Sequence, residues 1–308
     1  MWGGGGGGVA AAVNCAAAAV YSGQAECVVV YRGLSENTDG RRAFNKDYIS
    51  PLYTAHGAMA PAQICALRTQ RMLEVDEVPT SALEAVAMAG YHHAQTNPAA
   101  VAYGHPLDHE LYQGSRWISE PLRLYDCSRE NDGAAAILVV PAERAADYAG
   151  TPAHILSGVQ GAAAGWTESV ENEERYTSAG FHPRLVQRLW DGAGIGAGDV
   201  DVTQVYENFT GPAVAALIDH GLCPPGRAAG DVLTVGNLTL PGGTLPINTA
   251  GGNIAEGFVH GIGLVIEAVR QIRGGSPNPV PGADISLLIG GPMAPLVSST
   301  VFGSPATV

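Results

Sequence analysis

The chain has 308 residues, of which 46% are hydrophobic and 15% charged, and its formal net charge is −13. This composition excludes a disordered chain and suits one large or two ordinary folded domains. The negative charge disfavours nucleic acid and anionic membrane surfaces as partners.

Ordered elements are predicted along most of the chain. Residues 9–22 are Ala-rich and predict a helix that Gly23 ends. The apolar residues 26–31 predict a strand buried on both faces. From about 35 to 125 the pattern is irregular and rich in Tyr, His, Pro and Arg. The later elements are a buried strand at 132–140, strands at 153–161, 203–206 and 284–289, and helices at 208–222 and 254–273.

The most informative segment runs from Asn248 to Gly261 and reads NTAGGNIAEGFVHG. It resembles the C-terminal motif of the thiolase superfamily, N-x-x-G-G-x-x-x-x-G-H-P-x-G. In thiolases that catalyse Claisen condensation, the His of this motif polarises a thioester carbonyl. Phe258 occupies that position here.

Three further segments resemble thiolase signatures but lack their catalytic side chains. Tyr206 opens YENFT, where the family carries a catalytic Asn, and Leu288 stands in LLIGGPM where the second catalytic Cys belongs. Gly6, within the glycine run 3–8, falls on the position of the nucleophilic Cys. The resemblance therefore implies that acetyl transfer through a cysteine thioester does not occur.

This set of replacements, together with SRWISEPLRLYDC at 115–127 and DGAA at 132–135, is most similar to the lipid-transfer-protein branch. That branch includes the retro-aldolases of steroid side-chain degradation. The resemblance implies a thiolase-like α/β fold with αβαβα layers and two similar halves. Residues 1–151 would form a partial N-terminal half, with a loop domain at about 35–125, and residues 152–308 the C-terminal half.

The family places several strands and helices before the helix predicted at 9–22. We therefore expect the N-terminal half to be truncated, and a naturally minimal thiolase-like protein is the alternative. Without those strands the N-terminal sheet would expose hydrogen-bonding groups at its edge.

A retro-aldol cleavage needs a base for the hydroxyl proton and donors that stabilise the developing thioester enolate. The resemblance places one set of donors, backbone N–H groups of an oxyanion hole, at Gly6 and Gly290. Helix N-termini after Gly8 and Gly252 would point positive dipole ends toward the same cleft. Gly252 is therefore a further candidate for substrate binding.

Tyr206 is the main acid–base candidate, because tyrosine replaces the catalytic Asn in this branch. With an ordinary phenol pKa of about 10 it would need a neighbouring donor or cation to act as a base; packing of its ring over the loop is the alternative. His260 is a second catalytic candidate, although a helical step of two would turn it away from Phe258 and leaves a structural role open. Glu207 and Asn208 could orient Tyr206, or Asn208 could cap the following helix.

Phe258 lines the expected substrate site where related aldolases often carry Tyr. The pairs His92-His93 and His105/His109 lack carboxylate or Cys partners at ligand spacing, so we expect no metal. No cofactor is expected besides the coenzyme A thioester that serves as substrate.

The five cysteines form no CxxC pair and are interpreted as reduced core thiols of a cytoplasmic protein. No apolar run of about 18 residues predicts a membrane span. We therefore expect no membrane as a partner.

Two functions are consistent with the sequence. The first is a lyase that cleaves a β-hydroxyacyl-CoA of the steroid side-chain type into a ketone and a shorter acyl-CoA. The second is a non-catalytic thiolase-like or lipid-transfer subunit that binds acyl-CoA or lipid. Relatives in this branch work with an acyl-CoA-binding protein that has an OB-fold and a zinc ribbon. The resemblance thus implies a hetero-complex, containing a homodimer of this chain if the N-terminal half is intact.

Overall fold

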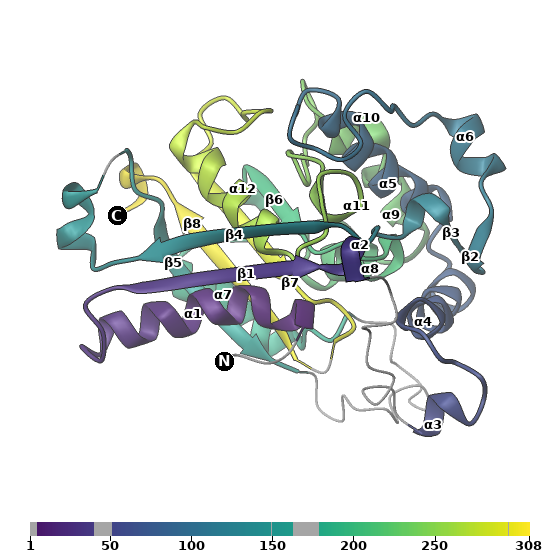
Figure 1. The fold of residues 1–308 in the computed structure, drawn as a ribbon, viewed down its shortest axis with the longest axis horizontal. Coiled ribbons are helices and arrows are strands. Elements are labelled where there is room, and N and C mark those ends of the chain that lie inside the picture. The colour runs from purple at the N-terminus through teal and green to yellow at the C-terminus, as the bar shows by residue number, and fades with distance from the viewer. Residues whose placement is uncertain (1–4, 40–50, 149, 163–178, 295) are drawn as a thin grey trace.

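The computed structural model describes residues 5–39, 51–148, 150–162, 179–294 and 296–308. These residues form two main β-sheets with helices between and beside them (Figure 1). The first sheet pairs β1 (Val28–Ser35) with β4 (Asp132–Val139), and the second has the order β5 (His154–Gly161), β8 (Val297–Gly303), β7 (Ile285–Gly290), β6 (Val202–Val205).

The four-stranded sheet carries the last four strands. β5 and β7 each run antiparallel to β8, whereas β6 runs parallel to β7. All residues of β6, β7 and β8 are buried. Side chains of a strand alternate between its two faces, so both faces of this part of the sheet must be covered. The strands predicted at 153–161, 203–206 and 284–289 are confirmed as β5, β6 and β7. β5 begins one residue later than predicted, and β6 and β7 are each displaced by one residue.

Helices cover the two faces of this sheet. On one face, Leu288 packs in a cluster with residues of α1 (Gly8–Tyr21) and α12 (Ile262–Arg273). On the other face, Leu287 and Ile289 pack with residues of α7 (Pro183–Ala193) and α8 (Thr210–Asp219). The helix predicted at 9–22 is confirmed as α1.

The two-stranded sheet lies on the far side of α1 and α12, so these helices form a layer between the two sheets. Its inward side chains, among them Val30 and Ile137, pack on that helix layer. Its outward side chains are open: Val29 is 59% exposed, Tyr31 74% and Leu138 44%. The prediction that the strand at 26–31 is buried on both faces is wrong, and the strand at 132–140, predicted as buried, is also open on its outer face. No helix in the described ranges covers that face. The described residues therefore build four of the five expected layers.

The region from 51 to 148 is more regular than predicted. Two long helices, α4 (Pro61–Val75) and α5 (Ser81–Ala94), pack against α8 and contradict the irregular pattern expected at 35–125. A buried carboxylate links this region to the C-terminal half. Asp126 accepts hydrogen bonds from the hydroxyls of Tyr112 at 2.8 Å and Thr210 at 2.7 Å.

Several shorter elements complete the described chain. The remaining α-helices and strands are α2 (Glu36–Asp39), α3 (Pro51–Thr54), α6 (His109–Gly114), β2 (Trp117–Ser119), β3 (Leu122–Arg123), α9 (Ala229–Val232), α10 (Val235–Leu238) and α11 (Gly252–Ala255). The 3₁₀ helices are η1 (Gly5–Gly7), η4 (Leu124–Asp126), η5 (Ala142–Asp147), η7 (Ala197–Asp199), η8 (Gly226–Ala228) and η9 (Pro305–Thr307).

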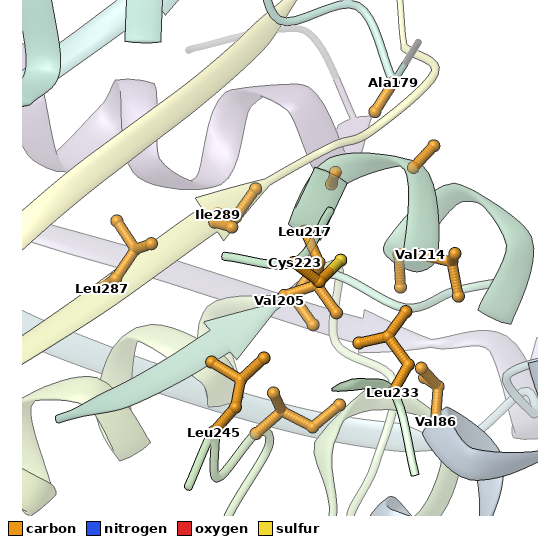
Figure 2. Close-up of a cluster of buried hydrophobic side chains, with 14 of the residues drawn as sticks. Val86, Ala179, Val205, Val214, Leu217, Cys223, Leu233, Leu245, Leu287 and Ile289 are labelled. Carbon is orange, nitrogen blue, oxygen red and sulfur yellow. The ribbon is translucent and has the colours of Figure 1, made fainter. Parts of the chain in front are cut away.

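The main core lies between the four-stranded sheet and its outer helices. Figure 2 shows Val205 and Ile289 of the strands beside Leu217 of α8, and Leu287 and Leu233 belong to the same buried cluster. Cys223 is buried in the same cluster. The prediction of core thiols is correct for Cys127 and Cys223, which are buried, and wrong for the exposed Cys27; all five cysteines are free.

His220, at the end of α8, gives a prediction about acid stability. Its Nδ1–H donates to the Ala216 carbonyl at 2.8 Å, so Nε2 accepts from the Ser299 hydroxyl at 2.9 Å and the ring is neutral. Burial lowers its pKa from 6.5 to about 4. The folded state is then fully stabilised by this neutral ring above pH 6.5 and loses that stability as the pH falls toward 4. By linkage, the loss at pH 4.5 is about 2–3 kcal/mol.

The measurement is urea unfolding of the parent and of His220→Gln at pH 7.5 and at pH 4.5. We expect the parent to lose more unfolding free energy on acidification than the variant, by about 2–3 kcal/mol. Exposed His105, replaced in the same way, is the control and should behave like the parent. An equal loss in parent and His220→Gln would contradict the assignment.

Candidate active site

Tyr206 lies directly after β6 with 3% of its surface exposed. Its N–H donates to the Ile289 carbonyl at 2.9 Å, which continues the pairing of β6 with β7. Two glycines lie against its ring. A Cβ on Gly6 would lie 2.2 Å from Tyr206 Cζ, and one on Gly261 would lie 2.6 Å from Cδ2. The ring can therefore occupy this position only beside residues without side chains.

The turn before α1 packs on the loop after β7. A Cβ on Gly291 would lie 2.1 Å from Gly7, and one on Gly290 would lie 2.7 Å from Val9. The Ser298 hydroxyl donates to the Gly7 carbonyl at 2.7 Å. The structure thus brings Gly6, Tyr206 and the Gly290 loop together, as the resemblance implies. The oxyanion-hole role of the Gly6 and Gly290 amides stays a prediction.

Burial and the neighbouring Glu207 carboxyl raise the pKa of Tyr206 well above its usual value of 10. Glu36 on α2 acts in the same direction, whereas Arg32 on β1 opposes it. Together these effects favour the neutral phenol, so Tyr206 carries its proton at neutral pH. A resting hydroxyl of this kind donates a hydrogen bond or a proton more readily than it removes one.

Glu207 points away from solvent and holds the segment that follows Gly251. It is 1% exposed, and burial raises its pKa to about 8. Its carboxyl oxygens accept from Asn253 Nδ2 at 3.2 Å and from the Ile254 N–H at 3.3 Å. A Cβ on Gly252, whose φ is +65°, would lie 1.9 Å from Glu207 Oε1. Gly252 therefore packs against a carboxyl, which explains why a glycine is required there.

Asn208 does not cap the following helix. Helix α8 begins at Thr210 with Phe209 at its N-cap and no side-chain capping bond, so the capping alternative is wrong. The Asn208 carbonyl accepts from the Ser128 N–H at 2.9 Å. Within the described part of the chain, its buried side-chain Oδ1 has no hydrogen-bond partner. The side chain is thus held in the interior with an unused acceptor.

The helix predicted at 254–273 is interrupted. Helix α11 ends at Ala255 and α12 begins at Ile262, and His260 and Gly261 between them have φ of 49° and 79°. Left-handed backbone ends a helix, and the periodicity of the apolar positions does not reveal it. α11 has only four residues, so the dipole expected at Gly252 is small.

The interruption places His260 beside Phe258 rather than turned away from it. The Phe258 ring meets the His260 ring edge to face at a centroid distance of 5.1 Å, and the Tyr206 ring at 6.3 Å. Arg32 Nη2 lies 2.6 Å from His260 Nδ1. Burial, and secondarily the Arg32 charge, lower the pKa of His260 to about 4. The imidazole is therefore neutral at neutral pH.

The paired histidines have partners other than metal ligands. His109 Nδ1 lies 2.6 Å from Glu84, His92 Nε2 contacts the Leu240 carbonyl at 2.8 Å, and His93 Nε2 accepts from the Leu240 N–H at 3.0 Å. Among the residues the structure describes, no group of three or more His, Cys, Asp or Glu could hold a metal ion. In the same ranges, no helix is both long and apolar enough to cross a membrane.

Comparison with known proteins identifies the family. Residues 162–302 match a family described as thiolase C-terminal domain-like. The chain is 35% identical over 300 residues to the 17-hydroxy-3-oxo-4-pregnene-20-carboxyl-CoA lyase of Mycobacterium tuberculosis, an alignment that covers 91% of this chain and 75% of that protein. The chain belongs to the thiolase superfamily.

Two further similar proteins are named aldolases. The steroid side-chain-cleaving aldolase of Thermomonospora curvata is 34% identical over 287 residues, which cover 89% of this chain and 72% of that protein. The solved structure of the Ltp2-ChsH2(DUF35) aldolase superposes with a TM-score of 0.88 at 34% identity, over 97% of this chain and 78% of that one. The predicted thiolase-like α/β fold and the resemblance to steroid side-chain aldolases are confirmed.

One residue of this thiolase-superfamily site, Arg32, is not predicted from the sequence. Arg32 lies on β1 four residues after Val28 and alternates in register with the inward-facing Val28 and Val30, although Arg32 itself is exposed. A charged residue in register with the inward residues of an apolar strand is a signal that could have identified it. The strand predicted from the apolar run ends at 31, which leaves Arg32 outside it.

Proposed function

We propose that this thiolase-superfamily protein is a carbon–carbon lyase that cleaves a β-hydroxyacyl-CoA by a retro-aldol reaction. The products are a ketone and a shorter acyl-CoA, and the acyl group is of the steroid side-chain type. The activities of the lyase from Mycobacterium tuberculosis and the aldolase from Thermomonospora curvata support this proposal. Replacement of the thiolase catalytic positions by Gly6, Tyr206 and Phe258 also supports it, because a retro-aldol cleavage needs no cysteine nucleophile.

The reaction moves one proton from the β-hydroxyl to the α-carbon. As the Cα–Cβ bond breaks, the β-carbon becomes the carbonyl carbon of the ketone. The electron pair of the broken bond passes into the thioester enolate. The enolate is then protonated at the α-carbon. We assign this transfer to the neutral Tyr206 hydroxyl, which passes its own proton to the α-carbon as it takes the proton of the β-hydroxyl, so that the phenol ends the reaction neutral as it began. Its raised pKa favours the donating role in the resting enzyme.

The position of the Tyr206 hydroxyl carries the proposal. A Cβ on Gly6 would lie 2.5 Å from that oxygen, so the hydroxyl lies against the turn that opens α1. Helix α1 has 14 residues, and its N-terminus presents backbone N–H groups and a positive dipole end. Such donors stabilise an enolate oxygen most strongly when solvent is excluded. Proton donor and oxyanion donors would thus act on the same thioester.

We further propose a hetero-complex with an OB-fold, zinc-ribbon acyl-CoA-binding protein, in the cytoplasm. The solved Ltp2-ChsH2(DUF35) aldolase supports the idea of a DUF35 partner. The same proposal includes a homodimer of this chain within that complex. It also includes a division of the chain into an N-terminal half, residues 1–151, and a C-terminal half, residues 152–308. Coenzyme A enters as part of the substrate.

One observation favours a second function, that of a non-catalytic subunit binding acyl-CoA or lipid. Phe258 contacts the Tyr206 ring but has no hydroxyl, so it cannot supply a proton where related aldolases often carry Tyr. A binder would take up the same thioester without breaking it.

The test is incubation of the full chain and its partner with a branched β-hydroxyacyl-CoA, followed by mass spectrometry. We expect a ketone and an acyl-CoA that is shorter than the substrate by the atoms of that ketone. Acetyl-CoA alone should yield neither acetoacetyl-CoA nor a covalent acetyl adduct, because no cysteine stands at the nucleophile position. Binding of the substrate without turnover would favour the second function, and an acetylated Cys15 would contradict the structural argument.

A further inference from the structure

The pair formed by Arg32 and His260 has no role in the proposed reaction as described so far. Arg32 lies on β1, and His260 lies in the break between α11 and α12, 228 positions later in the chain. The structure gives Arg32 Nη2 as the hydrogen-bond partner of His260 Nδ1, at 2.6 Å. Arg32 therefore joins the two-stranded sheet to the loop that carries Phe258.

The chemistry of this contact fixes the proton on the imidazole. A guanidinium group has five N–H donors, has no acceptor and stays protonated in proteins. His260 Nδ1 must therefore accept, which leaves the single proton of the neutral ring on Nε2. The hydrogen-bond partner of one ring nitrogen commonly sets the tautomer in this way.

The surroundings keep the ring in this state. The backbone of His260 has a φ of 49°, an uncommon conformation for a residue with a side chain, so the loop holds this residue in a defined position. The Phe258 ring packs against the imidazole at 5.1 Å, and that ring in turn contacts Tyr206. The charged groups near Tyr206 are Glu36 on α2 and Arg32, whereas the raised pKa of Glu207 leaves that carboxyl mostly protonated at neutral pH.

We propose that Arg32 is a positioning residue that holds His260 as the neutral Nε2–H tautomer, so that the imidazole gives the thioester site a hydrogen-bond donor and not a base. The donor role toward the substrate rests on the proposed function, whereas the tautomer of His260 does not. It assigns the two candidate groups different tasks. Tyr206 transfers the proton, and His260 stabilises charge that develops on a substrate oxygen. A donor aimed at developing charge needs no change in its own protonation.

The first experiment needs no activity. Two-bond ¹H–¹⁵N spectra of the full chain, with His260→Gln to assign the signal, report which ring nitrogen carries the proton. We expect the Nδ1 shift of an unprotonated, hydrogen-bonded nitrogen, and protonation of the ring only near pH 4. A proton on Nδ1 in the parent would overturn the proposal.

Variants of Arg32 test whether its guanidinium group sets the protonation of His260. Arg32→Met removes donor and charge and should raise the protonation midpoint of His260 by about one pH unit, whereas Arg32→Lys keeps a charged donor and should hold it low. Arg144→Met removes an exposed charge that pairs with Asp147 elsewhere and is the matched control. The same midpoint in Arg32→Met as in the parent would also overturn the proposal.

The second experiment uses the complex with its partner and a β-hydroxyacyl-CoA. Arg32→Met should lower kcat about 10-fold or more with little change in KM, since the donor acts on charge formed in the transition state. Arg32→Lys should recover part of the loss. Unchanged kcat in Arg32→Met would overturn the positioning role. If the tautomer is as expected and the parent itself has no activity, the proposed function fails and the tautomer assignment stands.

Discussion

Replacing Tyr206 with Phe is expected to lower the rate of carbon–carbon cleavage by about 10²–10⁴-fold, the range for loss of a general acid–base group. The substitution removes only the hydroxyl, and the ring that packs between Gly6 and Gly261 remains. The fold and the affinity for acyl-CoA should therefore change little. Single-turnover kinetics of the complex separate the chemical step from binding and product release.

Tyr31→Phe is the matched control for this change. Tyr31 is 74% exposed on the outer face of the two-stranded sheet, so its hydroxyl is remote from the interior position of Tyr206. It should retain the parent rate. If Tyr206→Phe also retains the parent rate in an active complex, the proton passes through another group and the assignment of Tyr206 is wrong.

Replacing Gly6 with Ala is expected to abolish most of the activity by displacing the same tyrosine. The new methyl group would overlap Tyr206 Cζ at 2.2 Å and the hydroxyl oxygen at 2.5 Å. The turn cannot retreat easily, because a Cβ on Gly291 would already lie 2.6 Å from the Gly6 carbonyl carbon. We expect at least a 10²-fold loss of rate and a loss of about 1–3 kcal/mol in unfolding free energy, as for overpacking elsewhere.

The double variant Gly6→Ala/Tyr206→Phe tests whether Gly6 acts through Tyr206. Two changes on one catalytic unit are not additive, so the double variant should lose little more than the worse single variant. Gly236→Ala is the control, because Gly236 lies in α10 with no atom near its added methyl group. Full additivity, or parent activity in Gly6→Ala, would contradict the packing seen around Tyr206.

The sequence by itself determined the family and most of the regular elements. The 248–261 motif carries the resemblance because its glycines are required by close packing, as Gly252 against Glu207 and Gly261 against Tyr206 show. The helix at the N-terminus and the strands β5, β6 and β7 follow from local composition, which acts over a few residues. The same motifs also indicated that Gly6, Tyr206 and Gly290 belong to one site.

Tertiary structure decided the features that depend on distant partners. The apolar runs of β1 and β4 indicate strands, but only the packing of other layers determines whether a face such as that of Val29 and Tyr31 is covered. The helix predicted across His260 is broken by left-handed backbone, which apolar periodicity cannot report. The contact between Arg32 and His260 joins residues 228 positions apart, so the proton position on His260 follows from the fold and not from local sequence.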